Sequence, residues 1–154
     1  MTNEATDLFV PPPFAAHATS RDGEVFLWQQ LPGLVAVLAR GVFSQAFAHR
    51  SLAFYDPIIK SHGPLRVFAD FQQVTEYTRE ARDLMTASAV QNRQTLEGLH
   101  MLLSSKMVAL GISSLKHDMG DPLVHTYADR ASFLRSFVQS IRERESGHRP
   151  APAP

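Results

Sequence analysis

The sequence predicts an α/β domain in which about four helices cover a mostly parallel sheet of four or five strands that starts with an N-terminal β-hairpin. Two runs rich in β-forming residues, 24–29 and 34–40, are separated by a Pro-Gly turn signal. Further along, short apolar runs alternate with segments whose apolar residues recur at helical spacing. Such alternation favours right-handed crossovers and parallel strands.

The composition indicates one globular domain with an ordinary core. Of the 154 residues, 44% are hydrophobic, and 15 basic side chains balance 15 acidic ones. Because no Lys/Arg cluster is present, nucleic acid is not an expected partner. The chain has no cysteine, which excludes disulfides and Cys-based metal sites. The longest apolar runs are too short for a membrane span, so we expect a cytoplasmic protein.

The distribution of proline and small residues divides the chain into three predicted segments. Residues 1–22 contain Pro11–Pro13 and are expected to form a flexible arm. Residues 23–144 form the α/β domain. Residues 145–154, which are polar and then rich in proline and alanine, are expected to be a disordered tail.

In the first half of the domain, the hairpin leads into a helix and then into a central strand. Ser44 is the predicted N-cap of the helix, which ends near the Gly63–Pro64 break. The apolar run Leu65–Ala69 predicts a buried strand that ends at Asp70 and gives way to a polar turn.

The second half continues the alternation. A helix is predicted from an N-cap at Thr75 to about Arg93, followed by a strand over 96–103 and a helix opened by Ser104 and Ser105. Periodicity alone leaves open whether 95–115 is a strand plus a helix or a single helix. A short strand over 123–127 precedes a last helix capped by Asp129.

Two segments resemble the STAS domains, which are found in bacterial anti-sigma factor antagonists and in the cytoplasmic part of sulfate transporters. Arg66-Val-Phe-Ala-Asp70 with Val74 is similar to their central strand and turn, and Val108–Ile112 to their late helix. The resemblance implies a non-enzymatic regulatory domain that docks a partner protein, such as a regulatory kinase or a scaffold. In signalling members the next helix opens with a phosphorylatable Asp-Ser-Gly motif. Here the same place, 76–80, contains no serine.

The candidate docking residues lie at the carboxyl end of the predicted central strand and at the start of a later helix. They are Asp70, Gln72, Gln73, Thr75, Thr78, Arg79, Ser104, Ser105 and Lys106. The last three open a helix and could receive a phosphate or a carboxylate, although ordinary helix capping explains the serines more simply. Asp70 could act as an acid or a base, but a role in satisfying nearby backbone N–H groups is the simpler one.

No cofactor, metal site or catalytic constellation is predicted. His117, Asp118, Asp121 and His125 lie close in sequence but lack the spacing of a known metal site. No Gly-x-Ser-x-Gly elbow is present. The sequence therefore favours a protein that is not an enzyme.

Two functions from different classes follow. The first is partner docking along 70–79, and the open hairpin edge is also compatible with a homodimer. The second is the binding of a lipid or another small ligand, as in relatives of the Sec14 kind. It predicts an apolar pocket at the carboxyl edge of the sheet where Asp70, Gln72, Lys106 and His125 converge.

Overall fold

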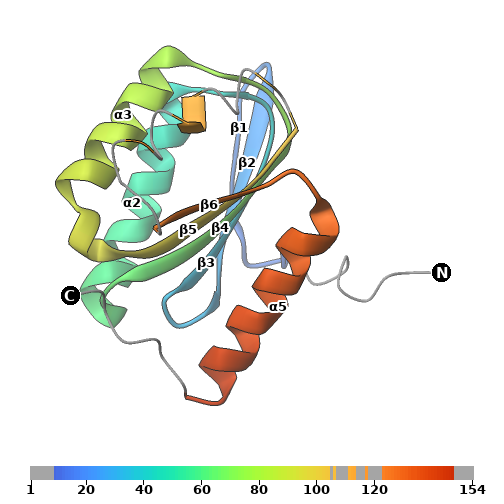
Figure 1. Cartoon of the computed structure of the whole chain (residues 1–154). Helices are drawn as coiled ribbons and strands as arrows, with labels where there is room; N and C mark the ends of the chain where they lie inside the picture. Colours follow the sequence, from blue (N-terminus) through green and yellow to red (C-terminus); the bar gives the residue numbers. More distant parts are fainter. Residues whose placement is uncertain (1–8, 105, 107–110, 114–116, 118–122, 148–154) are drawn as a thin grey trace.

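The computed structural model of the chain describes residues 9–104, 106, 111–113, 117 and 123–147. These residues form a six-stranded sheet in which the strands lie in sequence order (Figure 1). The strands are β1 Ala16–Thr19, β2 Gly23–Leu31, β3 Leu34–Phe43, β4 Leu65–Tyr77, β5 Leu96–Leu103 and β6 Val124–Tyr127. The first three are antiparallel, and β3 to β6 are parallel. The sheet is therefore mixed and larger than the predicted four or five strands.

Helices cover both faces of the sheet. α2 (Gln45–His62) and α3 (Arg79–Gln91) lie on one face, and α5 (Arg130–Glu145) lies on the other (Figure 1). Ser44, Thr78 and Asp129 cap the three helices, because each side chain accepts a backbone N–H of the first turn. The predicted caps Ser44 and Asp129 are confirmed.

The segment predicted to be a flexible arm contributes a strand to the sheet. Ala16–Thr19 pairs antiparallel with residues 24–27 of β2. The alanines of β1 pack against the core on the α2 side, and Phe9 is only 2% exposed. A strand is recognised in a sequence by alternating apolar and polar residues. The small side chains and the isolated phenylalanine of this segment do not show a clear alternation. Residues 1–8 and 148–154 lie outside the described residues.

The central strand is longer than predicted. β4 spans 13 residues, so Asp70 lies in mid-strand and no polar turn follows it. The strand continues because β3 extends to Phe43, which pairs with Tyr77 after two register irregularities. As a result, α3 is capped by Thr78 and not by the predicted Thr75.

Residues 96–103 form a strand, so 95–115 is not a single helix. Lys106 and residues 111–113 are helical, so a helix follows the strand as predicted. Ser105 and Val108 lie outside the described residues.

The alternation of side chains along the strands produces two separate cores. On the side of α2 and α3, the core contains Val37, Val67 and Phe71 among others. On the side of α5, it contains Trp28 and Phe68 with side chains of the helix itself. Because successive strand residues point to opposite faces, neighbours in β4 belong to different cores.

Candidate ligand-binding cavity

Three of the predicted site residues come together on the α5 face. Asp70 is 1% exposed, and its Oδ2 lies 2.6 Å from a guanidinium nitrogen of Arg130. Its Oδ1 accepts the backbone N–H of Gln72 at 3.0 Å, and the Ser104 hydroxyl donates to the backbone carbonyl of Gln72. This group ties β4 to the first turn of α5. Arg130 was not among the predicted site residues, although its position directly after the Asp129 cap places it in the first turn of the predicted helix.

The other predicted site residues do not join this group. Gln73, Thr75 and Lys106 are exposed, and Thr78 is engaged in capping α3. Arg79 forms an exposed pair with Asp83 at 3.7 Å. Ser105 lies outside the described residues. The predicted docking residues are therefore spread over a strand and two helix starts and do not form one turn.

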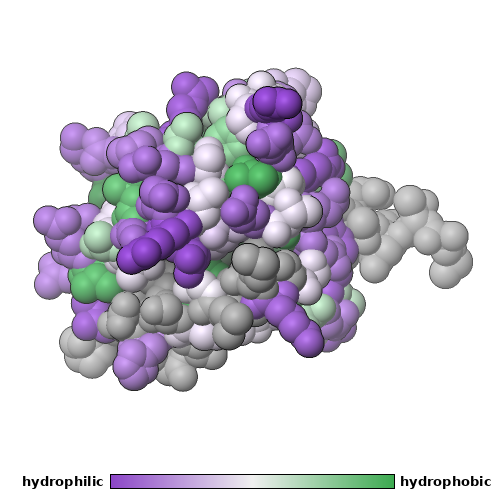
Figure 2. All heavy atoms as spheres, turned by 90° about the horizontal axis from the view of Figure 1, so that it is seen from above, coloured by the Kyte–Doolittle hydropathy of each residue, from purple (hydrophilic) through white to green (hydrophobic). Residues whose placement is uncertain are grey.

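The end of the molecule where α2 and α3 begin is mostly polar. Figure 2 views the molecule from above in the orientation of Figure 1 and shows hydrophilic residues over most of this face. Apolar residues are present only in small separate groups. Among the described residues that Figure 2 shows on this face, no large continuous apolar patch of the kind that marks many interaction sites is visible.

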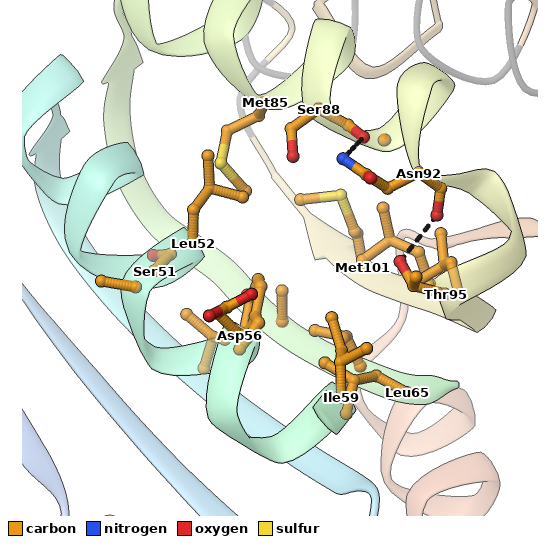
Figure 3. Close-up of a pocket in the computed structure, with 18 of the residues that line it drawn as sticks. Ser51, Leu52, Asp56, Ile59, Leu65, Met85, Ser88, Asn92, Thr95 and Met101 are labelled. Atoms are coloured by element: carbon orange, nitrogen blue, oxygen red, sulfur yellow. Dashed lines mark hydrogen bonds between the residues drawn. The ribbon is translucent and has the colours of Figure 1, made fainter. Parts of the chain in front are cut away.

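A cavity of about 500 Å³ lies between α2, α3 and the sheet. Figure 3 shows Leu52 and Asp56 of α2 facing Met85 and Ser88 of α3 across it. Its floor is formed by alternate residues of β4 from Leu65 to Phe71 and by strand residues on either side, among them Val37, Phe43 and Met101. The β4 residues from Leu65 to Phe71 span roughly 20 Å, so the lining extends along this part of the strand.

Small side chains explain why this space is not filled. Ser51 and Ala53 on α2, Ser88 and Ala89 on α3, and Ala69 on β4 all line the cavity. Larger residues at these positions would bring side chains of the two helices into contact and close the gap, as in a normally packed core.

One end of the cavity is polar and open. Asp56 and Asn92 are exposed lining residues. Asn92 donates to the Ser88 carbonyl at 3.0 Å, and the Thr95 hydroxyl donates to the Asn92 carbonyl at 2.6 Å (Figure 3). Asp56 pairs with Lys60 at 2.9 Å on the helix surface. A ligand would therefore enter past polar groups and reach an apolar interior.

The lining of the cavity includes two tyrosines. Tyr55 of α2 and Tyr77 of β4 line the cavity, and Tyr77 is 8% exposed. Burial raises the pKa of both phenols well above the usual range, and Tyr55 raises that of Tyr77 further. Among the described residues, neither hydroxyl has a hydrogen-bond partner. Both groups are therefore neutral and can donate to a molecule in the cavity.

The cavity differs from the pocket that the sequence predicted. Of the four predicted lining residues, Asp70 and Gln72 point to the α5 face, where they contact Arg130. Lys106 and His125 are not part of the lining either. The pocket belongs to Ala69 and Phe71 on the opposite face, because a shift of one residue along a strand reverses the direction of the side chain.

A second group of polar aromatic residues lies on the α5 face. Phe68, His100 and His125 stack across β4, β5 and β6 with ring centroids 4.3 and 4.5 Å apart. The His100 Nδ1 lies 2.8 Å from the Tyr127 hydroxyl, which donates to Ser136 at 3.0 Å. Among the described residues no group of three or more metal-ligating side chains is found. Phe68 and His100 of this stack are buried, whereas His125 is exposed.

The buried histidine makes stability depend on pH. Burial, together with the charges of His125 and Arg66, lowers the pKa of His100 to about 3. The unfolded chain binds a proton near the ordinary value of about 6.5, so folding is favoured less as the pH falls from 6.5 toward 3. At pH 4 we therefore expect the free energy of unfolding to be lower than at pH 7 by on the order of 3 kcal/mol because of this group.

Urea unfolding of a His100→Phe variant at pH 7 and pH 4.5 tests whether His100 causes this pH dependence. The variant keeps the aromatic stack. Its free energy of unfolding should fall less between the two pH values than that of the wild type. Replacement of the exposed His49 by glutamine is the control and should leave the loss unchanged. An equal loss in wild type and His100→Phe would contradict the assignment.

Comparison with known proteins agrees with the fold. No protein-family model matches the sequence, and no curated protein matches it. Within the part of the chain that the structure describes, no helix has the length and apolar character needed to cross a membrane. The structure is similar to that of an uncharacterised protein of the DUF3478 family, with a SpoIIAA-like fold, from Shewanella loihica PV-4.

The two structures align with a TM-score of 0.55 over 83% of this chain and 98% of the other, at 6% sequence identity. At this identity the likeness concerns the fold alone. It confirms the predicted resemblance at the level of the fold, with the N-terminal strands as an antiparallel extension of the parallel part. The chain therefore has a SpoIIAA-like α/β fold.

Proposed function

We propose that this protein binds a small, mainly apolar molecule in the cavity between α2, α3 and the sheet. The observation that carries the proposal is the cavity itself: its volume of about 500 Å³ falls within the range of small-molecule sites. Its lining is mainly aliphatic and aromatic with a few polar groups, the combination that such sites use.

The shape and charge of the cavity narrow the class of ligand. The lining follows β4 for roughly 20 Å, which suits an elongated molecule. Among the described residues, Asp56 is the one acidic or basic side chain in the lining, and it is paired with Lys60. Since the interior offers no ionised side chain as a partner, a charged ligand would lose hydration without compensation.

A cavity-filling variant with a matched control on the same helix tests this function. Ala89 lines the cavity, whereas Ala87 of the same helix is exposed and does not. We expect wild type and Ala87→Phe to bind N-phenyl-1-naphthylamine, an apolar fluorescent probe, with one molecule per chain. Ala89→Phe should bind it at least about tenfold more weakly, because the new ring occupies the same space.

Probe fluorescence gives the affinity, and circular dichroism and a thermal melt establish that each variant is folded. The proposal fails if the folded wild type does not bind the probe, or if Ala89→Phe binds it as tightly as Ala87→Phe. Native mass spectrometry of protein purified without denaturation adds an independent measurement, in which a copurified apolar molecule is the expected result.

Docking of a partner protein along 70–79 stays a prediction. The burial of Asp70 and the polar character of the face in Figure 2 give it less support than the cavity gives to ligand binding.

A further inference from the structure

The two tyrosines in the cavity indicate what kind of polar group the ligand carries. This inference rests on the proposed function and extends it to the chemistry of recognition. Tyr55 comes from the middle of α2 and Tyr77 from the end of β4, and both line the same cavity. They are close enough for Tyr55 to influence the ionisation of Tyr77.

The position of Tyr77 is fixed by aromatic packing. Its ring makes edge-on contacts with Phe43 at 5.4 Å and with Phe71 at 5.7 Å between centroids. All three residues line the cavity. The hydroxyl is therefore held by a rigid cluster at the end of β4, which favours recognition over simple space filling.

The two phenols offer hydrogen bonds that no described protein group uses. Among the described residues, neither the Tyr55 nor the Tyr77 hydroxyl has a protein partner. Neither hydroxyl is among the fully buried polar atoms that lack a partner, so both are accessible from the cavity. A phenylalanine at either position would fill nearly the same space without offering a donor. Two such donors in one mainly apolar lining are available to a molecule that the protein itself does not supply.

The partner must accept hydrogen bonds and need not carry charge. A phenol that stays protonated is a donor. Arg82 influences Tyr77, but its side chain packs against Gly111 and is not part of the lining. Among the described lining residues, the one ionised group is Asp56, which is exposed and paired with Lys60, so the described lining offers no cation to a carboxylate.

We infer that the cavity binds a neutral apolar molecule through a carbonyl oxygen that accepts hydrogen bonds from the Tyr55 and Tyr77 hydroxyls. A ketone, an ester or a quinone has this chemistry. The apolar body of the ligand would then extend along β4 toward Leu65 and the polar opening at Asn92.

Three probes of one shape test the inference on the full chain: 2-acetylnaphthalene, 2-ethylnaphthalene and 2-naphthoate. Calorimetry or fluorescence competition gives the dissociation constant of each. The ketone should bind more tightly than the hydrocarbon, by about fivefold for each hydrogen bond formed. The carboxylate should bind more weakly than the ketone.

Tyr55→Phe and Tyr77→Phe should each remove about fivefold from the ketone affinity and leave the hydrocarbon affinity unchanged. In the infrared spectrum, the carbonyl stretch of the bound ketone should lie at lower frequency in the wild type than in the double variant. Without ligand, each variant should melt close to the wild-type temperature, because the removed hydroxyl has no hydrogen-bond partner among the described residues. A purely structural tyrosine would give a lower melting temperature and no change in the carbonyl stretch.

The possible failures are distinguishable. If the hydrocarbon binds as tightly as the ketone, or if 2-naphthoate binds most tightly, the inference about the carbonyl is wrong while ligand binding stands. If none of the three probes binds to the folded wild type, both the inference and the proposed function are wrong.

Discussion

Replacement of Glu97 by glutamine is expected to lower the free energy of unfolding by about 3 kcal/mol. Glu97 on β5 lies 2.9 Å from Arg66 of β4 and 3.1 Å from Arg144 of α5. The side chains of Glu97, Arg66 and Arg144 are 13%, 13% and 8% exposed. Without the shared carboxylate charge, two poorly hydrated guanidinium groups lose part of the negative charge that stabilises them. Removing one partner of a buried ion pair in this way is strongly destabilising.

An exposed ion pair provides the control. Arg79 and Asp83 of α3 lie 3.7 Å apart, and their side chains are 82% and 73% exposed. We expect Asp83→Asn to change the free energy of unfolding by less than about 0.5 kcal/mol, because water already solvates both charges. Urea unfolding measures both variants, and an unchanged m-value shows that the midpoint reports stability. Equal effects of the two variants would show that the network of Glu97 does not hold α5 to the sheet.

This network was not visible in the sequence, although the elements that carry it were. Arg66, Glu97 and Arg144 are 31 to 78 positions apart, and only the parallel pairing of β4 with β5 under α5 brings them together. Helices and strands follow from local spacing and capping residues such as Ser44 and Asp129. Contacts between residues on different elements depend on register, which the sequence specifies only through the packed structure.

The same physical reason explains why the residues predicted to line a pocket at the carboxyl edge of the sheet are not those that line the cavity. The apolar run of β4 and its buried Asp70 were recognised, but a fully buried strand has no alternation that assigns its residues to a face. In the structure, Ala69 and Phe71 line the cavity, whereas Asp70 contacts Arg130 under α5. The space itself arises from small residues on α2 and α3, and their facing positions become known only when the two helices are placed.

Replacement of Phe9 by alanine is expected to lower the free energy of unfolding by about 3 kcal/mol. Phe9 lies near the start of the described chain, yet its ring packs against Trp28, Phe133 and Phe137 with centroids 5.4, 5.1 and 4.8 Å away. Truncation removes most of a fully buried aromatic side chain from the core under α5. This value lies at the low end of the range for such truncations, because neighbouring side chains can partly relax into the space.

Phe14 is the matched control, since it belongs to the same segment but is 74% exposed. Phe14→Ala should leave the urea midpoint nearly unchanged, whereas Phe9→Ala should lower it. This difference would establish that residues preceding β1 are part of the folded domain, in contrast to the flexible arm that their composition predicts. If Phe9→Ala is as stable as Phe14→Ala, the ring contributes nothing to the core. The boundary predicted at residue 23 would then describe the stable unit, with β1 as a weakly attached edge strand.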